Sequence, residues 1–249
     1  MDSRLKAIMD FVPSGSRVAD IGTDHGYLAI ELIKQNIAEF VVASDKNPKP
    51  LAAAQKNIRD AGIDNKNIDL RLSDGLKSLK VGEVDVICVA GMGGALMCEI
   101  LDASPEIVAG VEKIILQPMN VVERVRQWSA ENNFHIEDED LAEVDGIIYE
   151  IICLSKTFSK SKPTKKSKSP LLQKYINAKI EKLQKVHNSM SKSERAKNSK
   201  KYIEIENQIK ELRAKLYEKP NSTDNLRCNE QNCTKIFSGR VGQPRSACR

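Results

Sequence analysis

The sequence of 249 residues has few aromatic side chains and no long apolar run. Phenylalanine, tryptophan and tyrosine together make up 4% of the chain. No segment approaches the roughly 18 consecutive apolar residues that a membrane-spanning helix needs. The first residues, Met1-Asp2-Ser3-Arg4, include an acid and lead into no apolar stretch of the kind found in secretory leaders. The sequence therefore predicts a soluble protein with a cytoplasmic location.

Cysteine occurs at six positions, and its placement does not favour disulfides. Cys88, Cys98 and Cys153 lie within apolar runs, where a thiol behaves as a small apolar side chain and fits a reducing compartment. The remaining three are Cys228, Cys233 and Cys248. Their spacing is unlike that of zinc ligands and no histidine accompanies them, so we expect no metal site.

Charge is distributed unevenly along the chain. Up to Leu154 there are 15 basic and 26 acidic residues, a net charge of −11. From Ser155 to Arg249 the counts are 24 and 8, a net charge of +16, so the overall +5 combines an acidic first part with a strongly basic second part. The basic part favours a polyanionic partner such as a nucleic acid.

Short apolar runs alternate with stretches of helix-forming residues from Arg17 to about Leu116, which is typical of a parallel sheet covered by helices. The predicted strands are residues 18–21, 41–44, 68–72, 84–89 and 114–116, and the predicted helices are residues 27–36, 48–61, 94–101 and 121–133. Two further apolar runs flank Asp145-Gly146, a dipeptide typical of a tight hairpin turn. The predicted fold is therefore α/β, with a mostly parallel sheet and an antiparallel edge hairpin at residues 134–144 and 147–154.

The basic second part begins with a stretch that lacks periodicity. Residues 157–169 are rich in lysine and serine and predict a solvated linker after a first domain at residues 1–156. Apolar side chains then recur at spacings of three and four, which predicts one seam on each of two helices. The seam residues are Ile176, Ile180, Leu183, His187 and Met190, followed by Tyr202, Ile205, Ile209, Leu212 and Leu216. We expect an antiparallel helical hairpin at residues 170–219, with His187 as a packing residue, and a disordered tail at residues 220–249.

Acidic side chains follow three consecutive predicted strands. The segment from Asp20 to Gly26 joins the first strand to the first helix, Asp45 closes the second strand, and Asp74-Gly75 follows the third. Open α/β sheets bind ligands at the carboxyl ends of their strands, and an acid placed like Asp45 accepts hydrogen bonds from ribose hydroxyls. Asp74 would suit the exocyclic amine of the adenine in a bound nucleoside. The pattern predicts a nucleoside site.

The nature of the nucleoside follows from the charge of the first turn. Asp20 and Asp24 would repel the pyrophosphate of a dinucleotide, whereas they suit the sulfonium and ammonium groups of S-adenosylmethionine. The residues expected to bind this cofactor are Asp20, Gly22, Asp24, His25, Gly26, Asp45, Asp74, Gly75, Ala90, Gly91 and Gln117.

Glycines follow the fourth predicted strand, where the methyl acceptor would approach. Their bare backbone would let a flat base come close, although the same residues would also suit a tight strand-to-helix turn. After the fifth strand, Gln117 and Asn120 offer amides for a base edge or for the methionine end of the cofactor, and Tyr27 or Met92 could cover a face of the base. The residues expected at the reacting end are Asp24, Tyr27, Gly91, Met92, Gly93, Gly94 and Asn120.

These motifs together resemble the bacterial tRNA (adenine(22)-N1)-methyltransferase family. The residues that carry the resemblance are Arg4-Leu5, Val12-Pro13, Ala19 to Leu28, Ala90 to Gly94, Leu116-Gln117-Pro118 and Asp145 to Glu150. The resemblance extends over roughly residues 3–219. It implies a Rossmann-like class I methyltransferase domain followed by a basic helical hairpin, with S-adenosylmethionine as donor and N1 of an adenine in the D-arm of tRNA as acceptor.

Methyl transfer to N1 of an adenine would require little acid or base catalysis. Its N1 lone pair lies in the ring plane and is essentially unprotonated at neutral pH, so positioning is expected to dominate and no base needs to remove a proton. The enzyme must also expose the adenine. Asp24 is a candidate to bind the adenine amine. Because aromatic residues are sparse in the basic part, we expect it to hold the RNA backbone rather than to stack on bases.

Three other functions remain open at the level of sequence. A methyltransferase could act on another RNA site or on a protein. A non-catalytic RNA-binding protein could retain a nucleotide-shaped pocket, although the acids that follow three strands argue against it. A NAD-dependent oxidoreductase is disfavoured by Asp24.

Overall fold

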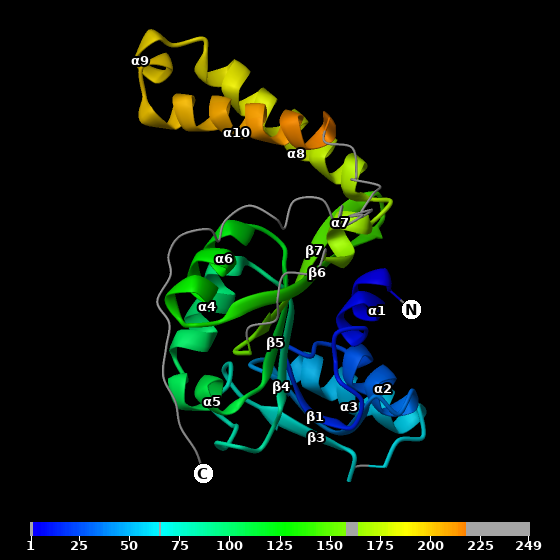
Figure 1. Ribbon diagram of the computed structural model, residues 1–249. Coiled ribbons are helices and arrows are strands. Elements are labelled where there is room, and N and C mark those ends of the chain that lie inside the picture. The colour runs from blue at the N-terminus through cyan, green and yellow to red at the C-terminus, as the bar shows by residue number, and fades with distance from the viewer. Residues whose placement is uncertain (1, 65, 158–163, 218–249) are drawn as a thin grey trace, which may run out of the picture. The chain divides into compact units, whose positions relative to one another are not determined.

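The computed structural model describes residues 2–64, 66–157 and 164–217 (Figure 1). The chain divides into two compact units, Met1–Glu181 and Lys182–Arg249. The strands of the first unit are β1 (Ser16–Ile21), β2 (Ala38–Asp45), β3 (Ile68–Leu72), β4 (Val86–Met92), β5 (Lys113–Pro118), β6 (His135–Val144) and β7 (Ile147–Ser155). Its helices are α1 (Ser3–Met9), α2 (Tyr27–Lys34), α3 (Pro48–Asp60), α4 (Gly94–Asp102), α5 (Pro105–Gly110), α6 (Val122–Glu131), α7 (Lys165–Lys168) and the first part of α8 (Leu172–Met190).

The seven strands form one sheet in the order β3-β2-β1-β4-β5-β7-β6. Neighbouring strands from β3 to β5 pair in parallel, whereas β7 pairs antiparallel with both β5 and β6. This confirms the predicted mostly parallel sheet with an antiparallel edge hairpin. The strand order reverses between β1 and β4, so a crevice for a ligand is expected at their carboxyl ends.

The turn of the edge hairpin lies where the sequence predicts it. Val144 of β6 pairs with Ile147 of β7, which leaves Asp145 and Gly146 as the two turn residues. Their φ angles are 50° and 79°. Two successive positive φ angles are typical of the hairpin turns whose twist matches that of the strands, and an Asp-Gly pair adopts them readily.

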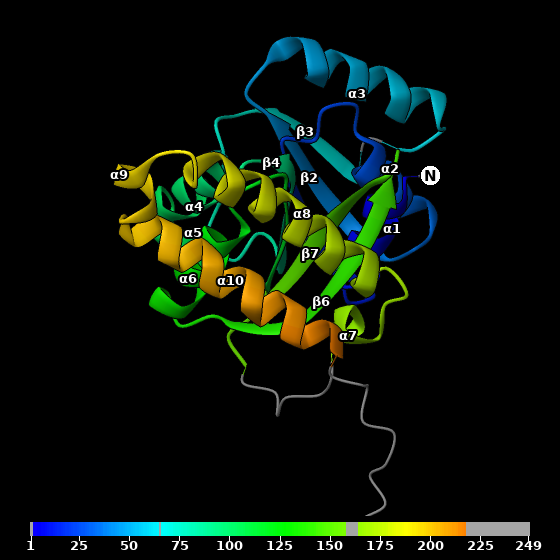
Figure 2. The same cartoon turned by 90° about the horizontal axis from the view of Figure 1, so that it is seen from above.

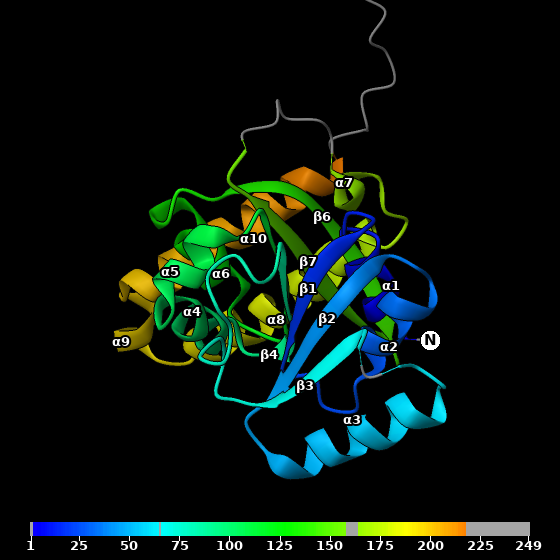
Figure 3. The same ribbon diagram turned by 90° about the horizontal axis from the view of Figure 1, so that it is seen from below.

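Helices cover both faces of the sheet (Figure 3). Buried apolar side chains of α1, α2 and α3 pack on one face, and those of α4, α5 and α6 pack on the other. Trp128 of α6 is 1% exposed, and its indole N–H donates to Asp102 at 2.6 Å. The cysteines predicted to behave as apolar core residues are buried and free, namely Cys88, Cys98 and Cys153.

The short helices α1 and α5 were not predicted. Asp2 caps α1 by accepting a hydrogen bond from the Arg4 backbone N–H at 2.8 Å. Pro105 occupies the first turn of α5, where its missing N–H costs nothing. Helices of seven and six residues complete fewer than two turns each, so their apolar residues show no clear period.

The segment predicted as a solvated linker, residues 157–169, contains the short helix α7 near its end. Thr164 caps α7 by accepting from the Ser167 backbone N–H at 3.2 Å. The Lys166 side chain is only 15% exposed and lies 3.6 Å from the carboxylate of Glu139 in β6. This attachment explains why the first compact unit continues past residue 156. Residues 158–163 lie outside the described part of the chain.

The second unit contains the remainder of α8, α9 (Glu194–Lys197) and α10 (Lys200–Tyr217). The His187 ring stacks on that of Tyr202 at 4.2 Å, and Arg213 donates to Gln184 at 3.3 Å. The second half of α8 and α10 therefore lie side by side (Figures 1 and 2), which confirms the predicted helical hairpin. Both ring nitrogens of His187 are buried without a hydrogen-bond partner among the described residues, as suits a packing residue.

The predicted disordered tail, residues 220–249, with Cys228, Cys233 and Cys248, lies outside the described residues. Within residues 2–64, 66–157 and 164–217, no helix combines the length and the apolar character that a membrane span requires. The same ranges contain no group of three or more His, Cys, Asp or Glu side chains arranged to hold a metal ion.

Candidate active site

A cavity of about 640 Å³ lies at the carboxyl ends of β1, β4 and β5. Eight of the predicted site residues line it, namely Asp20, Gly22, Asp24, His25, Tyr27, Ala90, Gly91 and Gln117. Seven further residues line the cavity and were not assigned to the site from the sequence: Asp2, Arg4, Leu5, Thr23, Leu28, Ile30 and Glu31. The cavity therefore combines the strand ends with the amino-terminal segment and α2.

Asp20 is the most deeply buried acid of this cavity. It lies at the end of β1, is 4% exposed, and accepts a hydrogen bond from the Thr23 hydroxyl at 2.6 Å. The backbone N–H groups of Gly22 and Thr23 donate to the Ser44 carbonyl at 2.8 and 2.9 Å, which ties the turn to β2. Burial raises the pKa of Asp20 to about 6, against the opposing effect of the Thr23 hydrogen bond. A bound cation would favour its ionised form.

The turn after β1 brings a second acid to the cavity. Asp24 adopts a φ of 52°, and its backbone N–H lies 3.4 Å from a carboxylate oxygen of Asp45. The Asp24 carboxylate is 68% exposed and lies 3.7 Å from the His25 ring nitrogen Nε2. The exposed Tyr27 ring stacks on that of His25 at 5.6 Å. The turn thus presents a carboxylate and an aromatic pair together.

The glycines after β4 fall into two groups. At Gly91, with a φ of 74°, an added Cβ would meet no atom within 4 Å, and its backbone N–H donates to Gln117 Oε1 at 3.1 Å. At Gly94, a Cβ would lie 2.6 Å from the Val121 carbonyl oxygen, and at Gly93 it would lie 3.0 Å from Asn120 Oδ1. Gly91 faces open space, whereas Gly93 and Gly94 allow the turn to pack closely against the segment after β5.

Several predicted site residues are not among those that line the cavity in the described part of the chain. They are Gly26, Asp45, Asp74, Gly75, Met92, Gly93, Gly94 and Asn120. Asp74 is bound to Lys77 at 2.5 Å, which lowers the pKa of Asp74. The Met92 methyl lies 2.1 Å from where a Cβ of Gly22 would be, so this flexible side chain covers Gly22.

The amino-terminal segment adds a cation to the cavity. Arg4 donates through Nε and Nη2 to one carboxylate oxygen of Asp2 at 3.0 and 2.6 Å, and its guanidinium carbon lies 5.0 Å from the centre of the Tyr149 ring. These contacts fix the orientation of the guanidinium. Arg4 belongs to the motif that carries the family resemblance, which was the one signal that could have identified it.

Two hydrogen-bond donors of the cavity wall share a weak acceptor. Arg4 Nη1 lies 3.9 Å from the sulfur of Met119, and Nε2 of the fully buried Gln117 lies 3.7 Å from the same atom. A thioether sulfur is a poor acceptor, so both donors retain the capacity to bind an oxygen anion. The Met119 side chain is exposed and could move aside.

The charges of the lining residues fit S-adenosylmethionine. Four carboxylates line the cavity, from Asp2, Asp20, Asp24 and Glu31, together with the guanidinium of Arg4. The cofactor carries two cationic groups, the sulfonium and the ammonium, and one carboxylate. The acids suit the cations, and Arg4 with Gln117 suits the carboxylate. A pyrophosphate would face mostly acids.

Comparison with known proteins agrees with this fit. Residues 1–152 match a family described as a methyltransferase domain. The chain is similar to the tRNA (adenine(22)-N(1))-methyltransferase of Bacillus subtilis (strain 168), with 35% identity over 152 residues. That alignment covers 61% of this chain and 63% of the relative, so it spans less than two thirds of the relative's length.

Solved structures extend the similarity further along the chain. Streptococcus pneumoniae Sp1610 in complex with S-adenosyl-L-methionine is 29% identical, with a TM-score of 0.75 over 87% of this chain and 100% of that one. M. capricolum TrmK in complex with S-adenosyl-homocysteine is 28% identical, with a TM-score of 0.72 over 87% of this chain and 97% of that one. The family resemblance and the fold predicted from the motifs are confirmed.

Proposed function

The chain belongs to the family of methyltransferase domains that its first 152 residues match, and on this premise we propose that it methylates N1 of adenine 22 in the D-arm of tRNA. The observation that carries the proposal is the cavity at the carboxyl ends of β1, β4 and β5, whose charges complement S-adenosylmethionine. The name of the similar Bacillus subtilis enzyme supports the choice of adenine and of position 22.

The cofactor would be held by residues of β1, β2 and β5, of the turn after β1 and of α1. Asp20 and Asp24 offer carboxylates to its cationic groups, while Arg4 and Gln117 offer donors to its carboxylate. Asp45 lies beside the Asp24 backbone and is the candidate for the ribose hydroxyls. When bound, the cofactor supplies a methyl group on a positively charged sulfur.

The chain's own residues would position the adenine and need not move a proton. Gly91 leaves open space beside the cavity, and the stacked His25 and Tyr27 rings offer an aromatic surface for a base taken out of the tRNA stack. The exposed Asp24 carboxylate is the candidate acceptor for the adenine amine. Alignment of the N1 lone pair with the methyl group is the main contribution to the rate, worth several kcal/mol.

A tRNA substrate also accounts for the basic second part of the chain. Residues 155–249 carry a net charge of +16, which suits the phosphate backbone of RNA. The proposed activity would take place in the cytoplasm, where tRNA is modified.

The test uses the full chain with methyl-labelled S-adenosylmethionine and unmodified tRNA transcripts, followed by nuclease digestion and mass spectrometry of the nucleosides. We expect N1-methyladenosine from a transcript with adenine 22. A matched transcript with guanine at that position should give none. The affinity of the protein for the cofactor is measured separately by calorimetry without tRNA.

Each alternative function gives a different result in this test. Methyl transfer that survives the loss of adenine 22 would place the acceptor elsewhere in RNA. Cofactor binding without transfer to any tRNA would redirect the search to a protein acceptor. Tight tRNA binding with no cofactor binding would indicate a non-catalytic RNA-binding protein.

A further inference from the structure

Four of the five lysines in residues 165–179 form ion pairs with acids of the first unit. Lys165 pairs with Asp10 at 4.0 Å, and Lys174 pairs with Glu143. Lys166 pairs with Glu139 and Glu150, and Lys179 with Glu123 and Glu150. These four, Lys165, Lys166, Lys174 and Lys179, are named the docking lysines. Their partners come from the acidic first part of the sequence.

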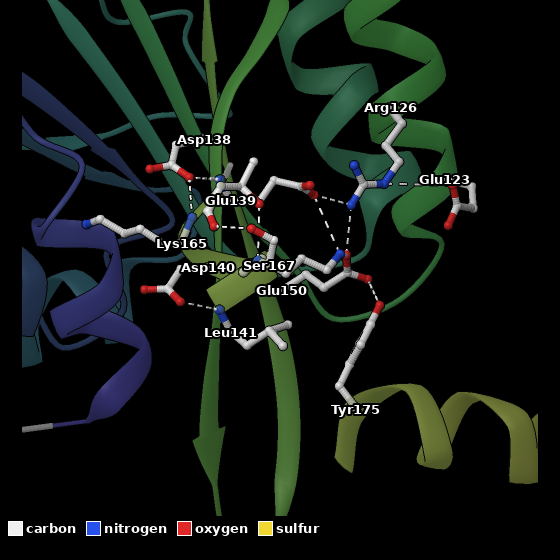
Figure 4. Close-up of polar contacts among 12 residues, drawn as sticks. Glu123, Arg126, Asp138, Glu139, Asp140, Leu141, Glu150, Lys165, Ser167 and Tyr175 are labelled. Carbon is white, nitrogen blue, oxygen red and sulfur yellow. Dashed lines mark hydrogen bonds and ion pairs between the residues drawn. The ribbon is translucent and has the colours of Figure 1, made fainter. Parts of the chain in front are cut away.

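Glu150 of β7 is the centre of this arrangement (Figure 4). Its side chain is 2% exposed and accepts from Arg126 of α6 at 2.8 Å, from the Tyr175 hydroxyl, and from Lys166 and Lys179. Burial alone would raise its pKa, but the charges of Lys166 and Lys179 and the hydrogen bonds from Lys166 and Tyr175 lower the pKa of Glu150 to about 2. Arg126, Lys166 and Lys179 are thus cations that pair with an ionised carboxylate.

The docking lysines are therefore poorly placed to bind RNA. A lysine that turned to a phosphate would leave a carboxylate such as that of Glu150 buried beside fewer cations, which is strongly unfavourable. Lys166 and Lys179 also lie over the Tyr175 ring, at 5.1 and 4.9 Å from its centre. Cations already paired with protein carboxylates gain little from a phosphate that replaces one anion with another.

The second unit also has basic side chains that are exposed and, in the described part of the chain, unpaired. Six basic side chains there are exposed and have neither an ion pair nor a side-chain hydrogen bond among the described residues. They are Lys182, Lys185, Lys192, Arg195, Lys201 and Lys215, and we name them the free cations. Within residues 182–217, ten basic residues face four acidic ones. The free cations come from both long helices and from the segment between them, so the phosphate backbone of an RNA could contact several of them at once.

We propose that tRNA phosphates are bound by the free cations of residues 182–215, and that the docking lysines instead hold α7 and the first turns of α8 on the sheet. The inference rests on the proposed function for the identity of the polyanion. It divides the basic part of the sequence into two functions: the lysines nearest the catalytic sheet have a structural role, and the later ones bind the substrate.

The test compares two full-chain variants that each lose four lysines. One carries Lys182→Gln, Lys185→Gln, Lys192→Gln and Lys201→Gln, and the other carries glutamine at the four docking lysines. The affinity for an unmodified tRNA transcript is measured by fluorescence anisotropy at a series of salt concentrations. We expect the first variant to lower the slope of log K against log salt by about three, with an unchanged unfolding midpoint, because each lost phosphate contact removes slightly less than one released counterion.

The docking-lysine variant should retain the slope of the unmodified chain while its unfolding midpoint falls. An equal loss of slope in both variants, or a loss confined to the docking-lysine variant, would overturn the inference. If the quadruple docking variant does not fold, Lys174→Gln and Lys185→Gln make a matched single pair, since Lys174 pairs near the surface and Lys185 is free. The expected result is a smaller slope only for Lys185→Gln.

The outcome separates this inference from the proposed function. Salt-dependent tRNA binding through the free cations, without methyl transfer, would overturn the proposed acceptor and leave the division of the lysines intact. Methyl transfer to adenine 22, together with a slope of log K against log salt that does not change when the free cations are replaced, would support the proposed acceptor and overturn the division of the lysines. A wild-type affinity for tRNA that does not depend on salt would overturn the inference and indicate another polyanion, such as an acidic protein, for these side chains.

Discussion

At the scale of single residues, Asp20 is expected to make cofactor binding depend on pH. Burial raises its pKa to about 6 in the free protein, so its carboxylate is increasingly protonated below that pH. Only the ionised form attracts the sulfonium and ammonium groups. The affinity for S-adenosylmethionine, measured by calorimetry, should therefore fall by up to about tenfold for each pH unit below 6. Asp20→Asn should bind more weakly at pH 7 and show no such slope.

The same residue predicts an opposite effect on the stability of the ligand-free protein. The pKa of Asp20 is higher in the folded state than its ordinary value of 3.8, so the ionised group destabilises the fold increasingly from about pH 4 to pH 6. Asp20→Asn should raise the unfolding midpoint at pH 7 and give no gain near pH 3.5. Equal gains at both pH values would mean that the charge of Asp20 is not the cause.

Arg4 is expected to recognise the carboxylate of the cofactor. Its Nη1 and the amide of Gln117 share only the Met119 sulfur as partner in the described cavity wall. Decarboxylated S-adenosylmethionine should bind the unmodified chain on the order of tenfold more weakly than the complete cofactor. In Arg4→Gln the two ligands should bind alike. Lys6→Gln, which removes an exposed cation from the same helix, is the control and should keep the discrimination.

The predicted site residues that line the cavity are mostly those at or just after the strand ends. Asp20, Gly91 and Gln117 were predictable because a parallel sheet brings its carboxyl ends together. Arg4 was not assigned a role, because α1 has seven residues and no strand leads into the cavity from it. Gly94 was predicted to lie at the reacting end, and the structure places it against the Val121 carbonyl, a contact that no local pattern encodes.

At the scale of secondary-structure elements, Glu150 joins β7 to α6, α7 and α8. Replacement of Glu150 by glutamine should destabilise the chain by about 3 kcal/mol at pH 7, because three cations then lose a buried partner. The pKa of Glu150 is lowered to about 2, so its contribution is complete above about pH 4.5 and is lost as the pH falls toward 2.

Thermal unfolding of both proteins between pH 3 and pH 7 measures this effect. The gap between the midpoints of the unmodified chain and Glu150→Gln should narrow as the solution becomes more acidic. Glu143→Gln is a suitable control, since it removes a more exposed partner of a single docking lysine and should cost less. A gap that does not change with pH would show that glutamine perturbs packing rather than charge.

The elements themselves were predictable in proportion to their length and regularity. The strands of the sheet, the Asp145-Gly146 turn and the paired seams of α8 and α10 follow from apolar periods and turn residues. α7 was not predicted, because residues 165–168 are lysines and a serine whose helical turn depends on Thr164 as cap and on distant acids as partners. Such tertiary partners override local propensity.

At the scale of the whole molecule, the opposite charges of the two sequence parts have an internal function. The net charge of +16 in the second part suggested a single surface for RNA. The docking lysines, however, form ion pairs with Asp10, Glu123, Glu139, Glu143 and Glu150. The net charge of a segment therefore overstates the charge that it can offer to a partner. Pairing, which only the structure shows, determines how much remains.

The boundary of the catalytic unit gives a final prediction. The first compact unit reaches Glu181, whereas the sequence predicted a domain that ends at residue 156. A chain cut after residue 156 would keep Arg126 beside Glu150 but lose Lys166, Tyr175 and Lys179. We expect its unfolding midpoint to lie on the order of 5 to 10 °C below that of a chain cut after residue 181.

The chain cut after residue 181 should unfold close to the temperature of the catalytic unit in the full chain and bind S-adenosylmethionine with the same affinity, because every cavity residue precedes that point. It should also lose the salt-dependent part of tRNA affinity, because all six free cations follow Glu181. Calorimetry, thermal unfolding and anisotropy on the two shortened chains measure the three quantities. If the chain ending at 156 were as stable as the chain ending at 181, the docking lysines would add nothing to the catalytic unit, and the sequence-based boundary would be correct.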